Sequence, residues 1–139
     1  MDDRQRLEQM VTEINQLQKQ GETIAQQLEQ LNASLADIRS AYDAVDNMAG
    51  SVGKETLLPI GAGCFVKAEL KSEDVIVGVG SSVAIKKTRE ETLSTLKQDR
   101  EEVEKLIKTL TEQLENINKY ITEKRPEAEK LMRETGVQQ

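Results

Sequence analysis

The chain has 139 residues, of which 32% are charged and 2% are aromatic, and its net charge is -6. With one Phe, two Tyr and no Trp it lacks the bulk that fills a compact globular core, so we expect an elongated helical protein. No segment forms a basic patch, which argues against nucleic acid and against an anionic membrane surface as partners.

The first predicted element is a coiled-coil helix over residues 1–49. Its apolar residues repeat with the heptad spacing of a helical pair, which is more specific than a general amphipathic pattern. Only Gly21 interrupts the series, and Ala49-Gly50 supplies a helix stop. The predicted core positions are Leu7, Met10, Ile14, Leu17, Gly21, Ile24, Leu28, Leu31, Leu35, Ile38, Tyr42 and Val45.

The middle segment, residues 50–87, holds most of the eight glycines and changes to the period of two that β-strands show. Cys64, Val66, Ala68 and Leu70 fall on one face of the predicted strand, and the pattern recurs at 75–79 and 83–85. Turn residues occupy 61–63, 71–74 and 80–82, so we expect up to four short strands joined as two hairpins or a meander. Pro59 suits only an edge strand or the first strand.

The last predicted element is a second coiled-coil helix over residues 88–139. Thr88 and Glu91 form a capping-box pattern at its start, and Pro126 is expected to kink or restart the helix near its end. Two of the predicted core positions are charged. The core positions are Leu93, Leu96, Arg100, Val103, Ile107, Leu110, Leu114, Ile117, Ile121, Lys124, Ala128 and Leu131.

Two helices of nearly equal length around a segment that reverses the chain predict an antiparallel pair. The expected fold is therefore mainly α with a small β part, a long antiparallel coiled-coil helical hairpin with two central β-hairpins, in one domain. Four short strands from one chain cannot close a barrel, and open strand edges are normally paired or covered. We therefore expect the β-segment to be an assembly module that joins an oligomeric β-barrel platform.

The stretch "LLPIGAGCFVKAELKSEDVIVGVGSSVAIKKT", between two coils, resembles the alpha type of the prefoldin family. The residues that carry the resemblance are Pro59, Gly61, Phe65-Val66, Ala68, Leu70, Val75 to Val77, Gly80 and Thr88. The resemblance implies a hexamer of two alpha and four beta subunits whose hairpins form a barrel platform with projecting coils. It also implies a holdase that binds unfolded client proteins at the distal coil tips without ATP and passes them to the group II chaperonin.

The residue inventory argues against catalysis and against a bound metal or cofactor. The chain has no His, and Cys64 is its one cysteine, so the commonest general base, metal ligand and thiol partner are missing. The N-terminus has no apolar run that could serve as an export signal, so a reducing cytoplasm is the expected location.

The residues expected to mediate subunit assembly are the apolar side chains of the β-segment. Phe65 is the most informative of them, because period two places it away from the main apolar face. We expect Phe65 to be buried against a neighbouring subunit or against the base of the coil; the alternative is a lone exposed ring. The set is Phe65, Val66, Ala68, Leu70, Val75, Val77, Val79, Val83 and Ile85.

The residues expected to bind clients lie where the two chain ends meet, namely Leu7, Met10, Val11, Leu131, Met132 and Val137. Pro126 and Gly136 would loosen the second helix there, and methionine adapts to irregular apolar shapes. Ordinary packing between the helices is the alternative for Leu7, Met10 and Leu131. Two competing functions stay open, a coiled-coil scaffold or tether and a nucleic-acid-binding barrel, although one Phe and a near-neutral segment supply little for the latter.

Overall fold

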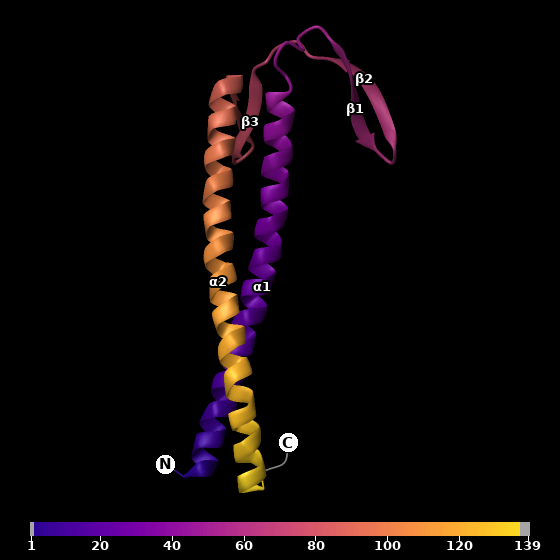
Figure 1. Cartoon of the computed structure of the whole chain (residues 1–139). Coiled ribbons are helices and arrows are strands. Elements are labelled where there is room, and N and C mark those ends of the chain that lie inside the picture. Colours follow the sequence, from indigo (N-terminus) through magenta and orange to yellow (C-terminus); the bar gives the residue numbers. More distant parts are fainter. Residues whose placement is uncertain (1, 137–139) are drawn as a thin grey trace. The chain divides into compact units, whose positions relative to one another are not determined.

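The computed structural model describes residues 2–136 and contains two long helices with four short strands between them in the sequence (Figure 1). Its contacts divide the chain into two compact units. Unit 1 combines the chain up to Ala33 with the chain from Glu104 onward, and unit 2 is Ser34–Val103. The elements are α1 (Asp3–Asp46), β1 (Glu55–Gly61), β2 (Cys64–Glu69), β3 (Val75–Gly80), β4 (Val83–Lys87) and α2 (Arg89–Thr135).

Both helices begin at side chains that satisfy free backbone amides. At α1, the backbone N–H of Gln5 donates to Asp2 Oδ1 over 2.8 Å, and the backbone N–H of Asp2 donates to Gln5 Oε1 over 3.4 Å. This reciprocal capping box was not predicted. At α2, the Glu91 amide donates to Thr88 Oγ1 over 3.1 Å, which confirms Thr88 as the capping residue.

In unit 1 the two helices run antiparallel. Leu7 of α1 forms a buried cluster with Ala128 and Leu131 of α2, whereas Gly21 faces Leu114 and Ile117. The residue numbers in contact fall along α2 as they rise along α1, which is the direction that the sequence predicted.

The heptad pattern identified the contact positions of both helices, because every predicted core position is buried or half-buried. The two charged positions are accommodated by aromatic rings. Arg100 lies over the ring of Tyr42, with 5.2 Å from Cζ to the ring centroid. Lys124 lies over Tyr120 at 5.7 Å, and its Nζ is 3.5 Å from a Glu127 oxygen. The aliphatic stems therefore stay against the seam while the charged heads meet rings or carboxylates.

Pro126 does not restart α2, which runs on to Thr135. A proline removes one backbone donor, and here the carbonyl that loses its partner is that of Thr122. The residues beyond the proline pack on α1, since Ala128 and Leu131 belong to the buried cluster with Leu7. That packing holds the last helical turns in place.

In unit 2 the start of α2 is tied to the end of α1 by Arg89. Its Nε donates to the Val45 carbonyl over 3.1 Å, and one terminal nitrogen donates to the Asp46 carbonyl over 2.8 Å and to Asp46 Oδ1 over 3.0 Å. The side chain is only 17% exposed. Because the last carbonyls of a helix lack intrahelical donors and carry partial negative charge, the guanidinium acts as a C-cap supplied by the other helix.

The strands form two separate antiparallel hairpins, β1–β2 and β3–β4, rather than a meander. Each has a two-residue turn with positive φ at both positions, at Ala62 (51°) and Gly63 (74°) and at Ser81 (52°) and Ser82 (60°). Turns of this hand match the twist of paired strands. Leu58 pairs with Val66 and Pro59 pairs with Phe65, so Pro59 lies in the first strand as predicted.

Candidate functional site

The apolar side chains of the hairpins are largely uncovered. Phe65 is 57% exposed and Ile76 is 68% exposed, although isoleucine and phenylalanine are normally among the more buried residue types. Exposed apolar area of this extent, gathered on short strands, marks a surface that a partner covers. The large apolar residues exposed in the hairpins are Leu57, Leu58, Ile60, Phe65, Val66, Ile76, Val79, Val83 and Ile85.

The β1–β2 hairpin exposes apolar groups on both of its faces. Directly paired residues of antiparallel strands share a face, so Leu58 and Val66 lie on one face while Pro59 and Phe65 lie on the other. Leu57, two residues before Pro59, adds to the second face and is 60% exposed. Phe65 is therefore not covered by the base of the coil, and it lies beside other apolar residues rather than alone.

The predicted assembly residues include part of the exposed apolar surface of the hairpins. Five predicted residues are exposed, and Ala68, Leu70, Val75 and Val77 are half-buried. Four further exposed residues were missed: Leu57, Leu58, Ile60 and Ile76. The run "LLPI" was the available signal, since consecutive apolar residues in a strand must occupy both faces.

The predicted client-binding residues separate into two groups in unit 1. Leu7 and Leu131 are 4% and 6% exposed and form the seam with Ala128, which is the packing alternative that the sequence left open. Met10, Val11 and Met132 are half-buried and pack against that cluster from outside. Val137 lies outside the described residues.

An apolar groove runs beside this buried cluster. Val11, Ile14, Ala128 and Met132 line a hollow of about 300 Å³. Its remaining lining is polar, from Asn15, Gln18, Arg125 and Glu129. Apolar and polar side chains thus line this groove together, which suits contact with an apolar segment whose backbone still needs hydrogen bonds.

Exposed polar contacts join the two helices in this region. An oxygen of Glu127 lies 3.8 Å from an Arg6 nitrogen. The Tyr120 hydroxyl donates to Glu13 Oε1 over 2.7 Å, and this bond is the main cause that raises the pKa of Tyr120. The hydroxyl therefore stays protonated at neutral pH and keeps donating.

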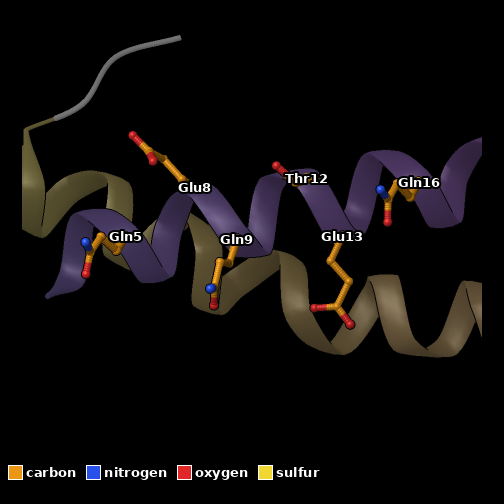
Figure 2. Close-up of a pocket in the computed structure, with 6 residues that line it drawn as sticks. All are labelled: Gln5, Glu8, Gln9, Thr12, Glu13 and Gln16. Carbon is orange, nitrogen blue, oxygen red and sulfur yellow. The ribbon is translucent and has the colours of Figure 1, made fainter. Parts of the chain in front are cut away.

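Figure 2 shows a second hollow on the same part of α1, lined by polar side chains of that helix alone, with Glu13 directed toward the neighbouring helix. Its residues are Gln5, Glu8, Gln9, Thr12, Glu13 and Gln16. A surface without apolar side chains gives an unfolded segment little to bury. The groove at Val11 and Met132 is therefore the better candidate for client contact.

Comparison with known proteins identifies the family. The prefoldin subunit family model matches residues 17–134. The chain belongs to the prefoldin family. A prefoldin subunit alpha of Methanosphaera stadtmanae is 70% identical over 138 residues, which covers 99% of this chain and 100% of the relative. A prefoldin subunit alpha of Methanobrevibacter smithii is 38% identical over 97 residues, which covers 69% of this chain and 66% of that protein.

The fold agrees with a solved prefoldin structure. The cryo-EM structure of filamentous PFD from Methanocaldococcus jannaschii matches with a TM-score of 0.65 and 19% identity, covering 79% of this chain and 93% of that chain. A helical hairpin with two β-hairpins is thus the prefoldin fold, as the resemblance implied.

Prefoldin alpha subunits form hexamers with beta subunits and deliver clients to a chaperonin, so this chain is a chaperone component. Prefoldin subunits are chaperone components rather than known enzymes. The scaffold or tether alternative is accordingly not favoured. None of the helices described within residues 2–136 has the length and apolar character to cross a membrane.

Proposed function

We propose that this prefoldin subunit holds unfolded proteins through the apolar groove of unit 1 and assembles through the exposed faces of its hairpins. The observation that carries the proposal is the half-buried set Met10, Val11 and Met132 beside the buried cluster. Half-buried methionines suit varied clients, because their flexible, polarizable side chains adapt to irregular apolar shapes.

Each groove is small, so a single chain would bind a client weakly. In a hexamer several grooves contact one unfolded chain, and the second and later contacts form at high effective concentration. The client is then held tightly overall yet can be released one contact at a time. Holding the unfolded state opposes aggregation by mass action and requires no bond to be made or broken, so we propose neither a catalytic step nor ATP use.

The hairpins are proposed to form the shared β-barrel platform. A two-stranded hairpin is marginally stable alone, and the β1–β2 hairpin exposes apolar residues on both faces. Pairing with hairpins of other subunits would satisfy the strand edges and cover those faces. The cytoplasm is the proposed location, since the chaperonin partner and newly made clients are found there.

The proposed client surface is tested with Met10→Gln and Met132→Gln in one chain, assembled with beta subunits; Met132 lines the groove, and Met10 packs against the buried cluster beside it. Glutamine keeps a similar length and helix propensity but removes the apolar contact. We expect capture of a chemically denatured enzyme to weaken roughly tenfold, as followed by light scattering without ATP. Leu106→Gln is the control, because Leu106 is an exposed residue of α2 (48%) that lines neither this groove nor the cluster.

Equal loss in the double variant and the Leu106→Gln control would contradict the groove assignment. Melting of the helical circular dichroism signal shows whether either variant has lost its coil. Unchanged capture by the double variant, with its coil intact, would remove Met10 and Met132 from the client surface.

A further inference from the structure

Gly21 is an anomaly in the seam of unit 1. It occupies a core position of the heptad series, is buried, and lies inside the unbroken helix α1. Relative to alanine, a glycine inside a helix shifts the equilibrium between helical and unfolded backbone toward the unfolded form by roughly fivefold. The chain therefore carries a local destabilisation at a position where seam residues normally stabilise.

Neither packing nor backbone geometry requires this glycine. A Cβ at residue 21 would lie 3.5 Å from Leu114 Cδ1 and 3.7 Å from Ile117 Cγ2, which are ordinary contact distances. Gly21 is not among the residues with positive φ. An alanine would fit and would add contacts to both side chains.

Open surface hollows border the seam at this level. Gly21 helps to line a hollow of about 640 Å³ together with Leu17 and Leu114. Another hollow, of about 620 Å³, is lined by Ile24 and Ile117. Because glycine contributes no side-chain contacts across the seam, the helix pair is held less firmly here than an alanine would hold it.

The polar contacts that hold α2 against the N-terminal end of α1, before Gly21, are weak enough for the helix pair to open. The ion pair of Arg6 with Glu127 is exposed on both sides, and exposed pairs contribute little. The bond from Tyr120 to Glu13 is exposed as well. On the facing helix, Pro126 has already removed one backbone hydrogen bond. The apolar contact that closes this end is the cluster of Leu7, Ala128 and Leu131, with Met10, Val11, Ile14 and Met132 packed against it.

We propose that Gly21 is a built-in weak point that lets the distal end of unit 1, residues 3–21 of α1 with the facing end of α2, open reversibly. Opening exposes Leu7, Ala128 and Leu131, which the closed pair buries, and adds them to the client surface. This inference rests on the proposed function, because it names how the client site becomes accessible. Reclosing of the pair supplies a force for client release.

The test uses Gly21→Ala in the full chain, assembled with beta subunits. Amide hydrogen exchange of residues 3–20 is expected to slow about fivefold, because alanine stabilises the closed helix. Capture of reduced, carboxymethylated α-lactalbumin, a permanently unfolded chain, should weaken by a similar factor, since apparent affinity scales with the open fraction. The matched control is Asn32→Ala, an exposed position of the same unit that raises helix propensity without touching the seam.

The outcomes distinguish opening at Gly21 from client binding. An unchanged amide exchange rate in Gly21→Ala, or an equal slowing in Asn32→Ala, would contradict the proposal that Gly21 is a weak point. Slower exchange with unchanged capture would overturn the link between opening and client binding. If the wild-type assembly captured no client, the proposed function would fall, while the exchange ratio would still decide whether Gly21 controls opening.

Discussion

Arg89 is the residue on which the junction of the two helices in unit 2 depends. It places one guanidinium against two carbonyls and a carboxylate at the end of α1, a helix without a basic residue in its own last turn. Hydrogen bonds that involve a charged group are stronger than neutral ones, and the planar fork can serve two acceptors together. Arg89 therefore fixes which turn of α2 lies beside the end of α1.

Arg89→Ala is expected to destabilise the assembled subunit by about 2 kcal/mol, because the carbonyls of Val45 and Asp46 lose charged donors. The stability of Arg89→Lys should lie between that of Arg89→Ala and that of the wild type, since a lysine keeps the charge but cannot bridge both carbonyls. Urea denaturation followed by circular dichroism measures both. A Lys variant as stable as the wild type would show that the fork geometry contributes nothing beyond the charge, and an Ala variant as stable as the wild type would show that neither matters.

At the scale of elements, the hairpins carry more strain than the helices. The helices have capped starts and no residue of positive φ within them, whereas the turn of the β3–β4 hairpin places two serines at φ of 52° and 60°. Residues with a Cβ are disfavoured in this left-handed region, and glycine is preferred at the second central position of such a turn. The turn of the β3–β4 hairpin is thus a point of local backbone strain.

Ser82→Gly should stabilise the β3–β4 hairpin by about 0.5–1 kcal/mol by removing that strain. The expected readout is a higher melting temperature of the assembled complex. Lys71→Gly is the control, because residue 71 lies in the exposed linker between the hairpins and has no positive φ. A glycine at residue 71 only increases the conformational entropy of the unfolded chain, so the melting temperature should not rise. A rise in the control alone would contradict the strain argument.

At the scale of the whole molecule, the chain is an incomplete structure. Its helices bury their own seam, but its hairpins present apolar faces to solvent, and we propose that its partner subunits cover those faces. Phe65 is the largest side chain in that surface, and large aromatic residues dominate the energetics of protein interfaces.

Phe65→Asp is expected to lower the assembled mass in solution when the chain is mixed with beta subunits. An aspartate at a covered position loses the apolar contact and must bury a charge, so each interface should weaken by about 2 kcal/mol or more. Light-scattering mass after size exclusion gives the result. Leu106→Asp, on the exposed face of α2, should leave the mass unchanged, and an intact hexamer of the Phe65 variant would exclude Phe65 from the interface.

Local patterns in the sequence were enough to predict the elements and the buried faces of the helices. Every position that the heptad spacing placed in the core is buried or half-buried, and the cap at Thr88 and the turns near residues 62 and 81 follow from local chemistry that acts within a few residues. That Phe65 and the rest of the β-segment mediate assembly stays a prediction, which rests on the need of open strand edges for partners.

Which of these faces are covered became clear only from the packing of the helices. Leu7 and Leu131 form the closed core while Met10 remains partly accessible, although all three occupy core positions of the heptad. That distinction depends on how α2 lies against α1, as does the clamp of Arg89 on carbonyls 43 and 44 residues earlier. Periodicity is a local property of one segment, whereas burial is set by the register between two segments that are far apart in the chain.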